Sequence, residues 1–482
     1  MRYSQLFILS FVFIFSLALS SCTGSRYNLP AWDFTKKTEQ PAQQAPAQIT
    51  TPGASIPDSS AAQAGEEKPY YAPANAPYTQ GAVSQEQLQD PRTATTSTYN
   101  STRVAILLPL TGPQANLGKA MLQTAQMALF DVGQANFELM PYDTEGTGDG
   151  ARIAATKAIE DDAQLILGPV FSNSVRAAKN VVRYHNVNMI SFSTDWSVTS
   201  SNVFIMGFLP FDQIERIITY AVSQDIKRIA AIAPQTVYGR AIISAYQTLA
   251  QQMGIETVDI LTYDPQNANL APDMRSFTHY DERMEEATTL AEAMQATKTT
   301  KSSQKRAQIK KEIERIKAEM EPPFDAVLIA AGGENAVAIS NLLSHYDLPP
   351  RKVKRLGIGL FDDEALASEF ALRDAWFSAP SIHGREAFEG RYKGLYGTVP
   401  PRLSSLAYDA TALAAILAQS GMQYRGIPNF NRVAITNPNG FAGIDGIFRF
   451  LENGTVERGL SVLGFERNSI VEVDPAPATF QR

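Results

Sequence analysis

The chain of 482 residues is poor in the residues that build disulfide frameworks and metal sites, with one cysteine and four histidines. A single cysteine excludes an intramolecular disulfide, and no histidine has a second histidine or a carboxylate at metal-ligand spacing. Positive charge is also in deficit, since 42 Lys and Arg face 49 Asp and Glu. General nucleic-acid binding relies on the opposite balance. We therefore expect no nucleic-acid partner and no metal or other cofactor.

Signatures of catalysis are missing as well. The sequence has neither a G-x-S-x-G elbow nor an H-E-x-x-H pair. The stretch LLPLTGPQANLGKAM (107–121) looks like a phosphate loop, but five residues instead of four separate Gly112 from Gly118, and Ala120 replaces the hydroxyl that would ligate Mg²⁺. We interpret it as a strand, a turn and a helix that begins near Leu117 and is capped by Asn116. The expectation is a non-enzymatic protein.

The first 21 residues have the pattern of a signal peptide. Arg2 supplies the positive charge, and residues 6–19 form an apolar core that is too short for a comfortable membrane span. The core ends in Leu-Ser-Ser-Cys (19–22), which resembles the bacterial lipobox, whose cysteine is lipidated and becomes the new N-terminus. The alternative is an ordinary signal peptide with an incidental cysteine. The resemblance implies lipidation of Cys22, and the absence of Asp at position 23 favours the outer membrane.

Residues 22–101 are expected to form a disordered tether. From residue 28 onward the segment is rich in Pro, Ala, Gln, Ser and Thr and has few large aliphatic side chains. Such a composition buries too little apolar surface to offset the entropy of ordering. A tether of ~75 residues spans ~50 Å on average and approaches ~250 Å at full stretch. It is long enough to hold a folded domain well away from its membrane anchor.

From residue 103 onward, strand-like runs alternate with helical patterns, which is typical of parallel sheets with crossover helices. The alternation restarts near residue 212 and predicts two α/β lobes. We assign residues 103–211 and about 377–432 to lobe 1, and residues 212–376 and about 433–475 to lobe 2. Ligands of open α/β sheets bind where strands end and helices begin, so the cleft between the lobes is the natural site.

An insertion at about residues 277–321 carries apolar residues at helical spacing on both sides of the polar break TKTTKSSQ. It predicts a helical hairpin on lobe 2. Residues 298–317 contain eight Lys or Arg. This charge is either the solvated face of a packed hairpin or a docking arm for an acidic partner or an anionic wall polymer.

Several long stretches carry a family resemblance, which covers about residues 103–475. They include the opening VAILLPLTGPQANLGKAMLQTAQMAL, the loops GPVFSNSV and ISFST, the turn TVYGRA and the segment NPNGFAGIDGIFRFLENGTVERGLSVL. The chain resembles the periplasmic binding proteins of the leucine/isoleucine/valine type and, more narrowly, the penicillin-binding protein activators, which are outer-membrane lipoproteins with this fold. The resemblance implies a two-lobed type 1 periplasmic binding protein fold.

The same resemblance implies a function and a location. The protein would be lipid-anchored in the outer membrane, face the periplasm, and bind and regulate a peptidoglycan synthase, a bifunctional penicillin-binding protein of the inner membrane. The alternative is a solute-binding lipoprotein that delivers an amino acid or related metabolite to an ABC transporter. A third interpretation is a hydrolase on the same scaffold. The long tether favours the activator, because a feeder of an inner-membrane transporter needs no such reach.

Seven side chains match positions that contact ligands in amino-acid binders of this fold. The candidate cleft residues are Ser172, Ser174, Ser193, Thr194, Tyr238, Phe361 and Asp362. Each has a second, structural interpretation: Ser172, Ser174 and Asp362 as helix caps, Tyr238 as a packing residue at a helix start. The sequence leaves open whether the cleft binds a small molecule.

Overall fold

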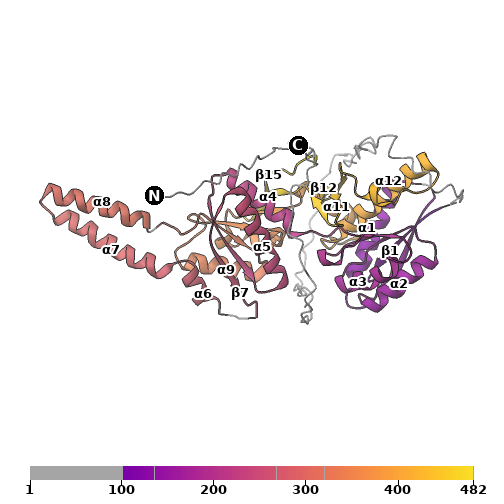
Figure 1. Cartoon of the computed structure of the whole chain (residues 1–482), viewed down its shortest axis with the longest axis horizontal. Coiled ribbons are helices and arrows are strands. Elements are labelled where there is room, and N and C mark those ends of the chain that lie inside the picture. Colours follow the sequence, from indigo (N-terminus) through magenta and orange to yellow (C-terminus); the bar gives the residue numbers. More distant parts are fainter. Residues whose placement is uncertain (1–100, 135, 267–268, 320, 481–482) are drawn as a thin grey trace, which may run out of the picture. The chain divides into compact units, whose positions relative to one another are not determined.

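The structure, a computed structural model, describes residues 101–134, 136–266, 269–319 and 321–480 (Figure 1). The expected signal peptide, Cys22 and the tether lie outside these residues. Within the described part of the chain, no helix combines the length and the apolar character needed to cross a membrane.

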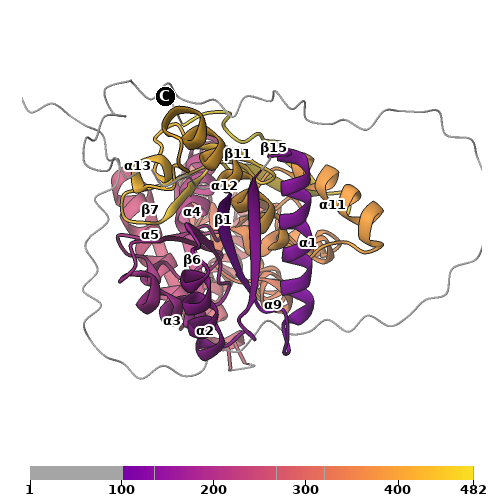
Figure 2. The same cartoon turned by 90° about the vertical axis from the view of Figure 1, so that its right-hand side faces the viewer.

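The first lobe is built on a five-stranded parallel sheet in the order β2-β1-β3-β4-β5. Its strands are β1 (Thr102–Leu108), β2 (Phe137–Asp143), β3 (Leu165–Leu167), β4 (Asn188–Ser191) and β5 (Val203–Ile205). The helices are α1 (Ala115–Val132), α2 (Gly148–Glu160), α3 (Ser172–Val182) and α12 (Ser404–Arg425), with the short η2 (Trp196–Val198). Helix α1 packs against α12, and α2 packs against α3. Figure 2 shows α1 on one side of β1 and the α2–α3 pair on the other.

The second lobe contains a seven-stranded sheet in the order β15-β14-β10-β9-β8-β6-β7. Strands β6 (Arg228–Pro234), β7 (Glu256–Tyr263), β8 (Ala326–Ile329), β9 (Lys354–Gly357) and β10 (Trp376–Ala379) are parallel, while β14 (Ser461–Glu466) and β15 (Ser469–Asp474) are antiparallel. Its helices are α4 (Pro210–Ser223), α5 (Val237–Met253), α6 (Ala271–Phe277), α9 (Gly333–His345) and α10 (Glu364–Ala367), with η3 (Gly359–Phe361) and η4 (Phe370–Leu372). Two separate apolar clusters cover this sheet. The expected two-lobed α/β architecture is confirmed.

Within the described residues, the chain crosses between the lobes three times, near Gly207, Pro380 and Gly459. Helices α11 (Ile382–Tyr396) and α13 (Arg432–Ile435) and a small antiparallel sheet lie between the second and third crossings. The sheet contains β11 (Phe441–Gly443), β12 (Gly446–Phe450) and β13 (Val456–Arg458). Phe448, Phe450 and Val456 are buried in the core of the first lobe. The expected boundaries are therefore corrected: residues 441–458 belong with lobe 1, and residues 377–379 belong with the sheet of lobe 2.

The hairpin expected at 277–321 is present as α7 (Tyr280–Thr299) and α8 (Ser303–Glu319), which run side by side (Figure 1). Ile313 and Ile316 of α8 are buried although most of the hairpin is exposed. At the base, the buried Arg283 donates hydrogen bonds to the carbonyl oxygens of Thr278 (3.1 Å) and Tyr346 (2.5 Å). These bonds attach the start of α7 to the lobe.

The turn that resembles a phosphate loop has a packing role. Helix α1 begins at Ala115 after Gln114, with no side-chain cap, so the expected cap by Asn116 is wrong. Gly118 lies in the first turn of α1, where a Cβ atom would stand 2.0 Å from the carbonyl oxygen of Pro109. The glycine therefore allows the helix to pack directly against the end of β1.

Gly118→Ala is expected to destabilise the protein because the added methyl group has no space beside Pro109. Overpacking of this kind lowers the free energy of unfolding by about 1–3 kcal/mol or more. The matched control is Gly390→Ala in α11, where nothing lies within 4 Å of the new Cβ atom. At that position, the higher helix propensity of alanine is expected to raise the free energy of unfolding by up to ~1 kcal/mol. Urea midpoints of the two variants test this, and equal midpoints would contradict the close approach of α1 to β1.

Candidate functional site

A cavity of about 280 Å³ lies where the two lobes meet. Both lobes contribute to its wall. The first lobe supplies the loop after β4 and the residues before α12, and the second lobe supplies the start of α5, the segment after β9 and the end of β10. The crossing near Gly207 completes the wall. The side chains that decide its chemistry are Thr194, Phe208, Tyr238, Leu360, Asp362 and Arg402. Among the described residues, no histidine, cysteine or lysine lines the cavity. Burial raises the pKa of Tyr238, which keeps its hydroxyl group neutral at physiological pH.

The structure brings three of the seven expected cleft residues to this cavity and leaves four elsewhere. Thr194, Tyr238 and Asp362 line it. Phe361 is fully buried in the core of the second lobe, where its ring stacks 6.2 Å from that of Phe465. The phenylalanine precedes Asp362 but points away from the cleft.

The three serines are engaged inside the first lobe. Ser174 is buried and donates a hydrogen bond to the carbonyl oxygen of Thr147 (3.0 Å), and the buried Ser193 hydroxyl accepts one from the amide of Asp195 (3.1 Å). The Ser172 hydroxyl accepts a long hydrogen bond from Arg176 (3.4 Å). None of these serines caps α3, whose N-terminal flanking residue, Phe171, has no side-chain cap.

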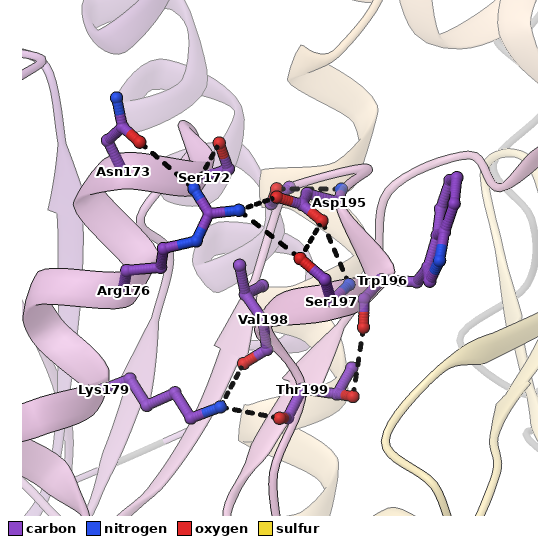
Figure 3. A network of polar contacts seen from close by, with 10 residues as sticks. Ser172, Asn173, Arg176, Lys179, Asp195, Trp196, Ser197, Val198 and Thr199 are labelled. Atoms are coloured by element: carbon purple, nitrogen blue, oxygen red, sulfur yellow. Dashed lines mark hydrogen bonds and ion pairs between the residues drawn. The ribbon is translucent and has the colours of Figure 1, made fainter. Parts of the chain in front are cut away.

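Figure 3 shows the polar network between the start of α3, where Ser172 lies, and the segment around η2. Arg176 of α3 forms an ion pair with Asp195 (2.5 Å), whose carboxylate also accepts hydrogen bonds from the amide and hydroxyl of Ser197. One turn along, Lys179 donates to the carbonyl oxygens of Val198 (3.0 Å) and Thr199 (2.7 Å). The network fixes η2 against α3, so these side chains have a structural role.

Asp362 is the acidic group in the wall of the cavity, and arginines of the opposite lobe neutralise it. Its Oδ2 atom lies 2.5 Å from Nη1 of Arg385 on α11 and 3.5 Å from Nε of Arg402. The side chains of Asp362 and Arg385 are only 6% and 15% exposed. Because α11 packs on α1 and Asp362 follows the core of the second lobe, these ion pairs connect the two lobes.

A second layer of charge lies behind Arg402. Its Nη2 atom is 2.8 Å from the fully buried carboxylate of Asp445, which also accepts a hydrogen bond from Ser405 (2.6 Å). The guanidinium groups of Arg402 and Arg458 each lie 4.7 Å from the centre of the Phe208 ring. Burial alone would lower the pKa of Arg402, but the attraction of Asp445 and Asp362 outweighs it and raises the pKa.

Arg458 connects the first and third crossings. It donates to the carbonyl oxygen of Met206 (2.6 Å), and its backbone amide donates to the carboxylate of Asp212 (2.9 Å). Nearby, Asp409 is buried on α12 and accepts a hydrogen bond from the amide of Ile444 (2.8 Å). Burial and the negative charge of Asp445 raise the pKa of Asp409. The connections between the lobes therefore enclose a network of buried charges.

The described residues contain no cluster of three or more His, Cys, Asp or Glu side chains that could hold a metal ion. The cleft offers the hydroxyl groups of Thr194 and Tyr238 as hydrogen-bonding partners for a bound molecule, and the ring of Phe208 as an apolar contact. Its carboxylate and guanidinium groups already neutralise one another across the lobes.

Arg385 and Arg402 are the functional residues that sequence reasoning missed. Both are more than 20 residues from Asp362 along the chain, and neither belongs to a recognisable spacing pattern. Arg402 lies two residues before α12 in the stretch VPPRLSS, where Pro400 and Pro401 mark a helix start but indicate nothing about the partner of the arginine. Phe208 likewise lies in a crossing segment with no sequence signature.

Comparison with protein families gives a match over most of the folded part. A family model described as "Periplasmic binding protein" matches residues 101–434. Among curated proteins, an uncharacterized protein of Rickettsia prowazekii (strain Madrid E) is 28% identical over 150 residues. That match covers 31% of this chain and 40% of the relative's length.

Solved structures share the fold at low sequence identity. A protein of Rhodospirillum rubrum, provisionally assigned to a branched-chain amino acid ABC transporter, superposes with a TM-score of 0.61 at 17% identity, covering 77% of this chain and 100% of the other. An ABC transporter substrate-binding protein of Sphaerobacter thermophilus superposes with a TM-score of 0.55 at 18% identity, and the match covers 78% of this chain and 97% of the other. A solute-binding protein of Rhodopseudomonas palustris BisB5 in complex with 3,4-dihydroxybenzoic acid superposes with a TM-score of 0.52 at 16% identity, and the match covers 78% of this chain and 97% of the other.

Asp409 is expected to make stability fall with rising pH. Its folded-state pKa is raised, so between the unfolded pKa near 4 and the raised value the folded protein retains a proton that the unfolded chain has lost. Asp409→Asn cannot ionise and keeps the acceptor for Ile444. As pH rises from 4 to 8, the free energy of unfolding of wild type is expected to fall relative to that of the variant, by up to ~1.4 kcal/mol per pH unit. Urea unfolding at several pH values measures this, and parallel profiles for both proteins would contradict it.

Proposed function

The chain belongs to the periplasmic binding protein family, and from that premise we propose that it is a non-enzymatic, membrane-tethered protein that binds and regulates a peptidoglycan synthase. It is lipidated at Cys22, anchored in the outer membrane and directed into the periplasm. Its partner is a bifunctional penicillin-binding protein in the inner membrane. The folded unit serves as an interaction module instead of a carrier of solute.

The observation that carries this proposal is the pairing of Asp362 with Arg385 across the cleft. A carrier of amino acids must offer charged groups to the charged ends of its ligand. Here a charged ligand would have to displace an arginine from a carboxylate that is 6% exposed. Separating such a buried pair leaves an uncompensated charge, at a cost of about 3–5 kcal/mol. The cleft therefore favours contact between the lobes over capture of a free amino acid.

The N-terminal sequence supports the same function. The lipobox-like residues 19–22 place an anchor at one end, and the Pro- and Ala-rich segment to residue 101 supplies reach. A protein that contacts a synthase in the opposite membrane needs this reach, which approaches ~250 Å. Regulation by contact requires only that the folded unit arrives at its partner.

Solute binding is the second candidate, and three observations favour it. The cavity of about 280 Å³ has the polar side chains of Thr194 and Tyr238 in its wall. One carboxylate oxygen of Asp362, Oδ1, is buried and has no hydrogen-bond partner among the described residues. The structural relatives are substrate-binding proteins of ABC transporters. A ligand that fits this candidate is small and donates a hydrogen bond to that oxygen.

Tether length separates the two functions. Shortening residues 28–101 to about twenty residues reduces the full-stretch reach to ~70 Å and alters no folded surface. We expect the shortened protein to fold, to remain in the outer-membrane fraction and to bind the purified synthase in solution, yet to fail to support wall synthesis in cells. Transfer of its anchor to the inner membrane is expected to restore that support.

Normal wall synthesis with the short tether would contradict the proposal. So would a rise in melting temperature with leucine that Thr194→Ala abolishes, because ligand at one hundred times its dissociation constant stabilises the folded state by ~2.7 kcal/mol. The full-length tether with scrambled sequence serves as the matched control, since it preserves reach.

A further inference from the structure

The free end of the α7–α8 hairpin has an unusual charge distribution. Between residues 293 and 311 the chain contains six cationic side chains and no Asp or Glu. All six are exposed, and among the described residues none forms an ion pair. We call them the basic tip: Lys298, Lys301, Lys305, Arg306, Lys310 and Lys311.

The rest of the hairpin has charges of both signs. The first half of α7 contains the acidic residues Asp281, Glu282 and Glu285. Asp281 pairs with Arg275 (2.6 Å), and farther along α8 Arg315 pairs with Glu312 (2.6 Å). An ordinary solvated helix surface has this mixed character. Among the described residues, the hairpin therefore has acidic side chains and ion pairs toward its base, and only cations without ion pairs at its tip.

The basic tip weakens the hairpin that carries it. The first turn of α8 contains no acidic residue and instead holds Lys305 and Arg306. Cations at a helix N-terminus are unfavourable because the backbone dipole is already positive there. Neighbouring like charges add repulsion. Packing and solubility do not require this arrangement, whereas an anionic partner would offset its cost.

The geometry of α8 indicates what kind of anion the tip fits. At 100° per residue, Lys305, Arg306, Lys310 and Lys311 are distributed around the helix and do not form a single stripe. Ile313 and Ile316 are not available for insertion into a membrane, because they are only 8% and 2% exposed; Met294 is the exposed large apolar side chain among the described residues of the hairpin. The tip also has no aromatic side chain that could stack on a sugar or anchor a protein interface.

We propose that the basic tip is a docking surface for an anionic lipid bilayer, to which the hairpin adsorbs through charge without inserting. Clusters of four to eight Lys or Arg bind anionic headgroups in this way, and the attraction fades within a Debye length of the surface. Because its cations are distributed around the end of the hairpin, the tip can meet the anionic headgroup surface without presenting one particular face of α8. This docking is independent of which protein the folded unit binds.

Vesicle sedimentation tests the proposal. All described helices and strands lie in residues 102–474, so residues 23–482 are used, which removes the apolar leader and the lipidated cysteine. The vesicles contain phosphatidylcholine alone or with about one third phosphatidylglycerol. We expect binding to the anionic vesicles only, and loss of that binding when ionic strength rises from about 0.05 M to about 0.5 M.

A charge-reversal variant and a matched control locate the binding surface. The tip variant is Lys305→Glu, Arg306→Glu, Lys310→Glu and Lys311→Glu. The control reverses four exposed cations elsewhere, with the same change in net charge: Lys157→Glu, Arg240→Glu, Lys393→Glu and Arg425→Glu. We expect the tip variant to bind anionic vesicles at least tenfold more weakly than the control variant. Exchange of Lys for Arg and Arg for Lys at the four tip positions is expected to preserve binding.

Three results would overturn the proposal. Equal binding by the tip variant and the control variant would assign the effect to net charge. Equal binding to neutral and anionic vesicles would assign it to apolar contact. Sedimentation with purified peptidoglycan sacculi but not with anionic vesicles would make a wall polymer the occupant. Circular dichroism of the tip variant verifies its fold, and its helix content is expected to match wild type because all four replaced side chains are exposed.

Discussion

The ion pair between Asp362 and Arg385 is the interaction on which the cleft depends. Its members come from different lobes, and both side chains are almost entirely buried. In such surroundings the attraction between opposite charges is strong, and each charge is costly without the other. Arg402 reinforces the pair and continues it to Asp445. The two lobes thus supply each other's counter-charges, and the charged groups in the wall of the cavity are not open to a charged ligand.

The crossings near Gly207, Pro380 and Gly459 make this arrangement possible. Each transfers the chain from one hydrophobic core to the other, and Arg458 ties the third crossing to the carbonyl oxygen of Met206 at the first. Phe208 lies at the first crossing with the guanidinium groups of Arg402 and Arg458 on its ring. A movement of the lobes would therefore disturb hydrogen bonds, ring contacts and ion pairs together. This coupling suits a unit that presents one defined surface to a partner.

Much of the fold was predictable from sequence because its signals are local. Apolar runs such as LILG at 165–168 mark strands covered on both faces, and the spacing of Ile309, Ile313 and Ile316 predicts the hairpin. The error at Asn116 arose because α1 begins two residues earlier than expected, at Ala115 after an uncapped Gln114. Phe448 and Phe450 were assigned to the wrong lobe because their alternation marks a strand but not the core that it covers.

The site was less predictable because its chemistry depends on remote contacts. Thr194, Tyr238 and Asp362, which were expected in the cleft because each follows a strand, line the cavity. The same rule failed for Ser174, whose hydroxyl turns inward to Thr147, and for Phe361, which the core of the second lobe takes up. No local pattern indicates that Asp362 is neutralised by Arg385, since only the packing of α11 on α1 brings that arginine to the cleft.

The distance between the lobes in solution tests the central claim most directly. Spin labels at Lys157→Cys and Arg240→Cys report it in residues 23–482, which contain no native cysteine. The account predicts one narrow distance distribution without any ligand, broadened by Asp362→Ala. It predicts no change with Asp325→Asn, because that residue pairs with Arg228 inside one lobe (2.7 Å). A broad distribution in the free protein that narrows only when a small molecule is added would contradict the account.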